Sequence, residues 1–258
     1  MRIDNTFHTE VVQYFEELEI QTSEIIEIQN GKTALKLDSE NLVIVCSTFY
    51  SGEITNKDVI NYPFIHLWQD QWQYHQEKVK SMLAAQVGHT CRIFARNTVA
   101  RQIDGNISKT FLNKNHIMAS PSSFTKLGLF RRTELLAVMT FSKPRPMTRK
   151  GDDYKSVEII RFCNRLHETV IGGMSKLINH YLKSFQPDDF MTSCDLDWAD
   201  GASLSKLGFV PTEITPPLKF VVNDSGKRHI ITSSNENAMD INQGNQRFLL
   251  HPEKLTLS

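Results

Sequence analysis

Hydrophobic positions recur along the first third of the chain with two spacings, one typical of helices and one typical of strands. Apolar residues three and four positions apart in FHTEVVQYFEELEI predict a helix that Thr6 can cap. QYHQEKVKSMLAAQV has the same period and predicts a second helix that ends at Gly88. NLVIVCSTF is apolar throughout, which predicts an inner strand, and Asn30-Gly31 between two alternating runs predicts a hairpin.

The rest of the chain alternates between the two periods. RIFARNTVARQI predicts a strand, and SKTFLNKNH predicts a helix capped by Asn106 or Ser108. KLGLFRR and ELLAVMTFS predict a hairpin that turns at Arg132-Thr133, and KPRPMTRKGDDYKS predicts a loop.

The last elements follow in the same way. VEIIRFC and FMTSCDL predict strands, and Gly172-Gly173 precedes a predicted helix, MSKLINHYLKSF. ASLSKLG predicts a short helix, and FVPTEITPPLKFVV predicts a strand pair bent at Pro216-Pro217.

This order of elements predicts an α+β fold, in which a mixed β-sheet with flanking helices accompanies a smaller N-terminal α/β module. We expect the module at residues 1–88, the larger domain at 91–225 and a polar C-terminal tail at 226–258.

Composition is that of an ordinary globular chain, with 40% hydrophobic and 22% charged residues. No run of about 18 apolar residues exists, and MRIDNTFHTE lacks the pattern of a secretory signal. We therefore expect a cytoplasmic protein with no membrane partner.

Charge is balanced overall, at 29 basic and 29 acidic side chains, but it is unevenly distributed. Residues 73–183 hold 19 Lys and Arg against 7 Asp and Glu, whereas residues 1–72 hold 4 against 12. A basic middle block is typical of a surface that binds phosphates, as in DNA or nucleotides. The alternative is a solvated basic face that pairs with the acidic ends.

Four cysteines lie apart from one another in apolar stretches, so we expect buried thiols and no metal site. Asp195, Asp197 and Asp200 resemble a calcium loop, but Lys206 stands where the terminal acidic ligand should be. Calcium is therefore rejected.

The segment VEIIRFCNRLHETVIGGMSKLINHYLKSFQPDDFMTSCDLDWADGASLSKLGF carries the most information. It resembles the cofactor-binding half of the GNAT acyltransferase family, in which a turn leads into a helix whose N-terminus faces the pyrophosphate of acyl-CoA. Unpaired amide groups in a first helical turn attract anions, and glycine lets the backbone approach them. The resemblance implies that acetyl-CoA or another acyl-CoA binds at a turn made of Ile171, Gly172, Gly173, Met174, Ser175 and Lys176. Gly172-Gly173 as a simple tight turn is the alternative.

A closer resemblance covers residues 107–209. FLNKNHIMAS, KLGLFRRTELLAVMTFSKPR, VEIIRFCNRLHETVIGGMSKL and SCDLDWADGASLSKLGF look like the C-terminal region of phage proteins labelled homing endonucleases and like relatives of the phage Mom DNA-modification protein. The resemblance implies acyl or carbamoylmethyl-type transfer to a nucleobase. It implies a shared site made of His116, Glu158, Arg161, Ser175, Asp195 and Trp198.

The individual residues leave alternatives open. His116 is either a base or a capping histidine at a helix end. Glu158 and Arg161 are three positions apart on one strand, so they point to opposite faces unless a bulge intervenes. Asp195 is either a substrate-facing carboxylate or a helix-start charge. Many GNAT enzymes have a tyrosine acid in the last helix, and Leu204 stands there instead.

Residues 24–72 faintly resemble the Vsr-like nuclease modules that precede such domains. LVIVCSTF has no acidic residue, and Val45 occupies the expected carboxylate position, so we expect a degenerate module that does not cut. Three hypotheses follow: a GNAT-like transferase acting on DNA or a nucleotide, a non-catalytic DNA-binding protein derived from a homing endonuclease, and a structural protein that reuses the fold.

Overall fold

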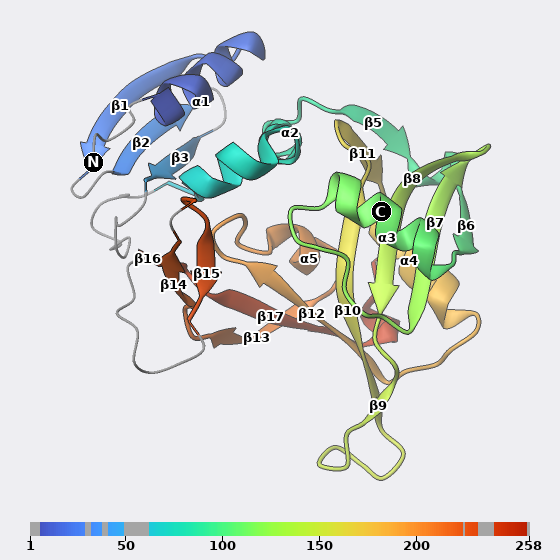
Figure 1. The fold of residues 1–258 in the computed structure, drawn as a ribbon. Coiled ribbons are helices and arrows are strands. Elements are labelled where there is room, and N and C mark those ends of the chain that lie inside the picture. The colour runs from blue at the N-terminus through green and yellow to red at the C-terminus, as the bar shows by residue number, and fades with distance from the viewer. Residues whose placement is uncertain are drawn as a thin grey trace. The chain divides into compact units, whose positions relative to one another are not determined.

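The computed structural model describes residues 6–28, 32–37, 41–48, 62–223, 225–231 and 240–256. The chain divides into two compact units. The first unit comprises Met1–Lys80, Cys194–Asp200 and Ile214–Gln246, and the second comprises Ser81–Ser193, Gly201–Glu213 and Arg247–Ser258. The predicted α+β class is confirmed, because the main sheet is mixed and helices flank it (Figure 1).

The first unit contains a four-stranded sheet in the order β1-β2-β3-β4. Its elements are α1 (Thr6–Glu17), β1 (Thr22–Ile28), β2 (Lys32–Leu37), β3 (Leu42–Ser47), β4 (Phe64–Trp68) and α2 (Gln69–Gln86). The strands β1, β2 and β3 are antiparallel, and β3 pairs with β4 in parallel, so the predicted inner strand is confirmed. Residues 30 and 31 of the predicted turn lie outside the described residues, but the strands on either side of it do form a hairpin.

Helix α1 buries Phe7, Val11, Tyr14 and Phe15, which lie on one face at helical spacing. Phe7 and Tyr14 contact the ring of Trp72 on α2, with ring centroids 6.2 and 6.3 Å apart. The apolar period of the sequence therefore marks the side of α1 that packs.

A small three-stranded sheet lies in the first unit, with the order β15-β14-β16. Its strands are β14 (Lys219–Val222), β15 (Arg228–Ile230) and β16 (Asp240–Ile241). The predicted strand pair in FVPTEITPPLKFVV is therefore wrong: β13 (Val210–Thr215) joins the large sheet, and β14 pairs with β15 and β16. Pro216 and Pro217 have no amide hydrogen to give a ladder, so the two strands separate there.

The main sheet has eight strands in the order β13-β17-β12-β10-β8-β7-β6, with β9 paired to β10. The remaining strands are β6 (Val99–Gln102), β7 (Thr125–Arg131), β8 (Glu134–Phe141), β9 (Arg145–Pro146), β10 (Lys155–Asn164), β12 (Asp189–Asp195) and β17 (Asn245–Leu250). The predicted hairpin is confirmed as β7 and β8. Strand β17 comes from the segment that we expected to be a polar tail, and it is held there by the buried side chains of Phe248 and Leu250.

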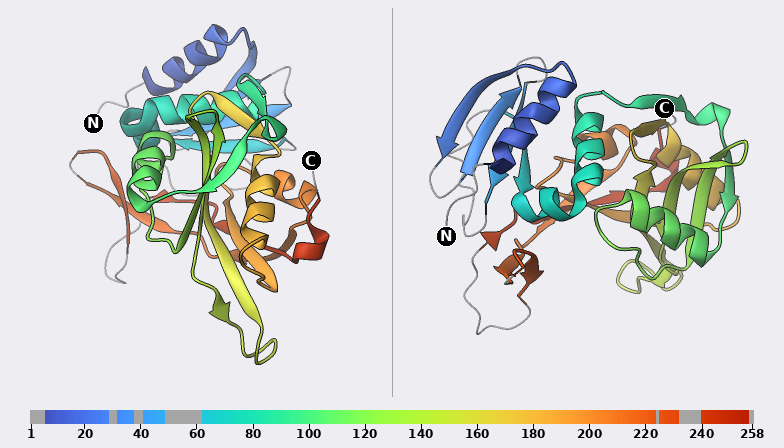
Figure 2. Two further views of the ribbon diagram at one scale, coloured as in Figure 1. Left: turned by 90° about the vertical axis from the view of Figure 1, so that its right-hand side faces the viewer. Right: turned by 45° about the horizontal axis from the view of Figure 1, so that its top comes forward.

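Two helices cover opposite faces of this sheet: α3 (Gly105–Asn115) and α4 (Gly173–Leu182). In the left view of Figure 2, α3 (green) and α4 (gold) lie on either side of the strands. Helix α3 packs on Val138 and Cys163, whereas the α4 residue Tyr181 stacks on Phe141. The cap of α3 is Asp104, which accepts hydrogen bonds from the amides of Asn106 and Ile107, so the predicted caps at Asn106 and Ser108 are wrong.

Short elements complete the second unit: β5 (Cys91–Phe94), η1 (Ala95–Asn97), β11 (Glu168–Ile171), α5 (Ala202–Lys206) and η2 (Pro252–Lys254). The single strand predicted in RIFARNTVARQI is broken by η1 into β5 and β6. β5 pairs in parallel with β11, and this two-stranded sheet lies outside the main sheet.

Burial of the cysteines differs from the expectation. Cys46 and Cys163 are buried, but Cys91 is exposed and Cys194 is half-buried, so the prediction is wrong for the last two. Cys91 begins a strand and Cys194 lies next to the last residue of one, where the side chain reaches the end of the sheet. None of the helices in the described residues is long and apolar enough to span a membrane.

Candidate functional site

Strands β10 and β12 run in parallel but pair over only three residues each. Ser156, Val157 and Glu158 lie opposite Asp189, Phe190 and Met191. This paired end is fixed by the buried carboxylate of Asp189, which accepts hydrogen bonds from Lys150 (2.9 Å), Tyr154 (2.7 Å) and Ser156. Burial alone would raise the pKa of Asp189, but these donors lower it below its ordinary value. The backbone ladder is thus confined to one end, and immediately beyond it the side chain of Thr192 on β12 donates to the carbonyl of Ile159 on β10 (3.1 Å).

A bulge interrupts β10 immediately after this paired end. Ile159 lies opposite Phe141 of β8, and Arg161 lies opposite the next residue, Thr140, so Ile160 is the extra residue. Because paired residues share a face, the bulge places Glu158 and Arg161 on the same face of the sheet. The sequence alone did not establish whether Glu158 and Arg161 share a face, and the bulge shows that they do.

Arg161 is held on that face with incomplete pairing. Its Nη1 donates to the carbonyl of Ile160 (2.8 Å), and its Nη2 lies 3.4 Å from the sulfur of Met118. Its buried Nε and the buried hydroxyl of the opposite residue, Thr140, have no hydrogen-bond partner among the described residues. Burial lowers the pKa of the guanidinium, and the carboxylate of Glu158 opposes that shift. Arg161 is therefore a partly desolvated cation that the charge of Glu158 stabilises.

His116 lies at the C-terminus of α3, near the same cation. Its Nδ1 accepts a hydrogen bond from the amide of Met118 (3.0 Å), whose sulfur contacts Arg161. Nδ1 also lies 3.3 Å from the carbonyl oxygen of Met118, and when Nδ1 accepts from the amide the neutral ring carries its proton on Nε2. His116 and Arg161 are thus brought to one place through Met118, with Glu158 on the face of Arg161.

The turn before α4 has the backbone that the sequence suggests. Gly172 has φ 74° and ψ 9°, a left-handed conformation that favours glycine, and it precedes the first helical residue. The first backbone bond back to Gly172 comes from the amide of Lys176 (3.1 Å), so the amides of residues 173–175 precede the regular hydrogen-bond pattern of the helix. Ser175 is buried, and its hydroxyl donates to the carbonyl of Gly172 (3.1 Å).

Lys176 has another contact. Its ammonium donates to the carbonyls of Ala95 (2.7 Å), the first residue of η1, and of Thr98, which follows η1. Ile171 is the last residue of β11 and lies opposite Phe94. The first turn of α4 is therefore tied to the β5–η1 segment by the side chain expected to add charge there.

Leu204 is half-buried in α5 and has no proton to donate. Gly201 precedes this helix with φ 81°, and a Cβ there would collide with the ring of Phe248 at 2.1 Å. The sequence Leu207-Gly208-Phe209 ends the helix as expected.

Asp195 and Trp198 belong to the first unit. The Oδ1 atom of Asp195 accepts a hydrogen bond from the amide of Asp197 (3.0 Å), and its carbonyl accepts from Trp198 (3.0 Å) and Ala199. Burial, with the neighbouring charge of Asp197, raises the pKa of Asp195 to about 6. This carboxyl organises the turn after β12.

Sequence reasoning missed a buried network in the first unit. His66 on β4 lies between Ser47 (2.8 Å from Nε2) and Asp197 (3.3 Å from Nδ1), and Asp197 also accepts from Trp68 (3.0 Å). The exposed fractions of Ser47, His66 and Asp197 are 0%, 0% and 3%. A histidine inside the apolar strand FIHLW was the available signal, because a buried imidazole needs partners. The three residues have the connectivity of a hydrolase triad, but no substrate reaches buried groups, so we interpret the network as structural.

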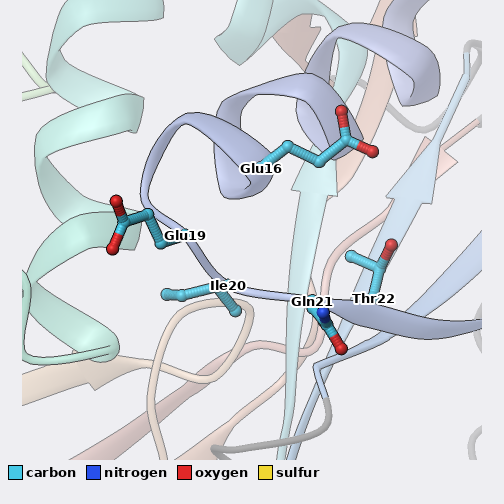
Figure 3. A pocket seen from close by; sticks show the side chains of 5 residues that line it. All are labelled: Glu16, Glu19, Ile20, Gln21 and Thr22. Carbon is cyan, nitrogen blue, oxygen red and sulfur yellow. The ribbon is translucent and has the colours of Figure 1, made fainter.

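A surface hollow of about 510 Å³ lies where α1 leads into β1. Its lining comprises Glu16, Glu19, Ile20, Gln21 and Thr22. The two glutamate side chains are exposed and point away from each other (Figure 3). The hollow therefore lacks converging polar groups. Among the described residues, no group of three or more His, Cys, Asp and Glu side chains could hold a metal ion.

Comparison with known proteins gives similarity only at the level of solved structures. No family model matches the sequence, and no curated protein matches it. The ribosomal-protein-S18-alanine N-acetyltransferase from Escherichia coli is 7% identical, with a TM-score of 0.40, and the match covers 62% of this chain and 96% of that one. A GNAT family acetyltransferase from Elizabethkingia anophelis with acetyl-CoA bound is 9% identical, with a TM-score of 0.36, over 60% of this chain and 98% of that one.

An acetyltransferase from Corynebacterium glutamicum is similar to the same extent, at 10% identity and a TM-score of 0.39, over 60% of this chain and 97% of that one. These values describe a weak overall likeness. What the second unit can do therefore follows from its own residues.

Proposed function

We propose that the second unit is a GNAT-like acyltransferase that moves an acyl group from acetyl-CoA or another acyl-CoA to an amino group of a DNA base or nucleotide. The separation of β10 from β12 after three paired residues is the observation that carries the proposal. The backbone ladder ends beside the bulge in β10, where side chains take over from the partner strand: Thr192 donates to the carbonyl of Ile159 (3.1 Å), and Arg161 donates to that of Ile160 (2.8 Å).

The residues of the turn fit an acyl-CoA. The first turn of α4 begins at Gly173, at the N-terminus of the helix, where the helix dipole is positive and a pyrophosphate is stabilised. Gly172 has no Cβ to obstruct that approach. The bound group would supply an activated thioester carbonyl.

The residues of the bulged face supply proton transfer and charge. Glu158 is the group on this face that can take a proton from an attacking amine. Arg161, whose Nε has no hydrogen-bond partner among the residues described, can stabilise the negative charge that develops on the carbonyl oxygen. His116 donates from Nε2. Leu204 cannot protonate the leaving sulfur, but a thiol with a pKa near 8.5 departs as a thiolate without an acid.

Thermal unfolding with and without acetyl-CoA tests the proposal. A ligand at about 100 times its dissociation constant stabilises the native state by about 2.7 kcal/mol, so the melting temperature should rise. Gly172→Ala should abolish the rise, because a Cβ at φ 74° displaces the turn.

Gly88→Ala is the matched control, because Gly88 follows helix α2 with φ 73° and has open space around its Cβ position. That variant should lose similar stability and keep the full response to acetyl-CoA. No shift in the wild type with any CoA thioester contradicts the proposal, as does the absence of an acyl adduct on oligonucleotide or nucleotide after incubation.

A second candidate is a DNA-binding protein without catalysis. The first unit supports it, because Val45, a fully buried apolar residue, stands where the resemblance to Vsr-like modules implies a carboxylate. Affinity for duplex DNA should then fall steeply between about 50 and 200 mM salt, since phosphate contacts release counterions. Salt-insensitive binding contradicts this candidate.

A further inference from the structure

The second unit holds a cavity of about 430 Å³ beside α3. Its lining comes mainly from one face of the helix, at positions four residues apart: Asn106, Thr110 and Lys114 form one line, and Ile107 and Phe111 form the next. Leu135 of β8 and Arg165, which follows β10, contribute the opposite side. The volume lies within the range of about 300–1,000 Å³ that small-molecule sites occupy.

The cavity has an apolar floor that remains accessible. Phe111 is 8% exposed and packs in a cluster with the half-buried Leu135, but Ile107 is 44% exposed. A large apolar side chain that stays open beside a packed aromatic group is suited to cover a flat, apolar ligand surface. The shape and composition of the floor therefore favour an aromatic or heteroaromatic ring.

The rim of the cavity carries more positive than negative charge. Arg165 is oriented by Glu168, whose carboxylate accepts from Nε (2.7 Å) and Nη2. Glu134 lies 3.7 Å from Arg165 and 3.2 Å from Arg131, so these two arginines and two glutamates balance one another. Lys114 forms no hydrogen bond or ion pair within the described residues and is exposed in the last turn of α3. It leaves one uncompensated positive charge at the rim.

The polar side chains of Asn106 and Thr110, which share a line with Lys114, can form hydrogen bonds with the edge of a ring. Asn106 and Thr110 are exposed and contribute an amide and a hydroxyl to the cavity. A side-chain amide can both donate to and accept from the edge of a purine, and a lysine binds phosphate as a point charge. The apolar floor, the side-chain amide of Asn106 and the ammonium group of Lys114 together match the base and the phosphate of a nucleotide.

We infer that the α3 cavity binds a nucleoside monophosphate unit, with the base over Ile107 and Phe111 and the phosphate at Lys114. The unit is a free nucleotide or a base turned out of a DNA strand. This inference rests on the proposed function in one respect, since it names the acceptor pocket of that transferase. The binding itself requires no acyl donor.

Calorimetric titration of the full chain with dAMP, in the absence of any CoA compound, tests the inference. Lys114→Met should weaken binding at least tenfold through loss of the phosphate contact, and Ile107→Asp should abolish it by placing a negative charge on the floor. Lys109→Met is the matched control, because Lys109 is exposed on the same helix but does not line the cavity. Its affinity should stay within twofold of the wild type.

A single-stranded oligonucleotide titrated alongside distinguishes the two sources. Tighter binding of the oligonucleotide with the same dependence on Lys114 identifies a DNA base, and binding of dAMP alone identifies a free nucleotide. Absence of binding by both ligands overturns the inference, as does an equal loss in the two lysine variants, which indicates unspecific attraction.

The same variants separate this inference from the proposed function. Nucleotide binding that depends on Lys114, together with no thermal response to acetyl-CoA, supports the nucleotide pocket and contradicts the proposed acyltransferase activity. Acyl transfer to a nucleotide with an unchanged KM in Lys114→Met supports the proposed acyltransferase activity and contradicts nucleotide binding in the α3 cavity.

Discussion

Two polar clusters in this chain contain residue types that do chemistry elsewhere, and they differ in how completely their atoms are paired. In the first unit, Ser47, His66 and Asp197 are buried and bonded to one another. In the second, Arg161 and Thr140 keep buried polar atoms that have no hydrogen-bond partner in the described part of the chain, beside a bulge. A saturated network stabilises a fold, whereas an incompletely paired one retains capacity to bind. The hydrogen-bond pairing and the accessibility of polar atoms therefore identify a candidate site better than residue type does.

Removal of Asp197 should produce the largest effect. Asp197→Ala leaves the ring of His66, the indole of Trp68 and the amide of Gln243 without their acceptor, which should cost about 3 kcal/mol of unfolding free energy. Urea denaturation measures this loss. Asp200→Ala in the same segment is the control, because Asp200 is exposed and surface substitutions change stability by about 0.5 kcal/mol or less. Equal losses in both variants would mean that the network contributes nothing specific.

Replacement of Arg161 should lower activity strongly and change stability little, unlike replacement of Asp197. Arg161→Met should lower acyl transfer at least tenfold, about 1.4 kcal/mol in the transition state, because the positive charge beside Glu158 is lost. Unfolding free energy should change by less than about 1 kcal/mol, since the variant removes a desolvated cation with an unpaired Nε. Arg149→Met, in an exposed loop, should alter neither quantity. A large loss of stability with unchanged transfer would reverse the roles of the two clusters.

The pH dependence of stability sharpens the comparison further. Burial lowers the pKa of His66 below the 6.5 of an unfolded histidine, although Asp197 opposes the shift. Below pH 6.5 the unfolded chain binds more protons than the folded one, so stability falls as the pH drops. The slope from this group reaches about 1.4 kcal/mol per pH unit at most. Urea midpoints between pH 7.5 and about pH 5 measure it, and His66→Asn should remove the slope.

Asp195 should give the smallest effect, with the opposite sign. Its folded pKa of about 6 lies above the ordinary 3.8 of an aspartate, so the folded state binds the extra proton between these pH values. Stability from this group therefore rises as the pH falls from about 6 toward 4. Asp195→Asn should raise the melting temperature slightly at pH 8, because the desolvated charge is gone while an oxygen remains for the amide of Asp197. The difference should vanish near pH 4, and a difference that persists there would show that charge is not its cause.

The sequence determined which segments form most elements, because helix and strand periods depend on neighbours a few residues away. The strand LVIVCS, the β7–β8 hairpin and the helix after Gly172-Gly173 were all predictable from such local patterns. The wrong predictions concern places where a distant partner decides. β17 is a strand because Phe248 and Leu250 are buried in the sheet. β14 pairs with β15 and β16, which lie further along the chain, and not with β13.

The sites depended on tertiary structure for the same reason. The bulge that puts Glu158 and Arg161 on one face is defined by the register with β8, and the short pairing of β10 with β12 is defined across about thirty intervening residues. His66 and Asp197 are 131 positions apart, so no local pattern could join them. Sequence by itself fixed the glycine turn and the residue types available, since backbone freedom and side-chain chemistry are local properties. Only folding decided which polar groups were saturated, because hydrogen-bond satisfaction depends on what distant segments bring into contact.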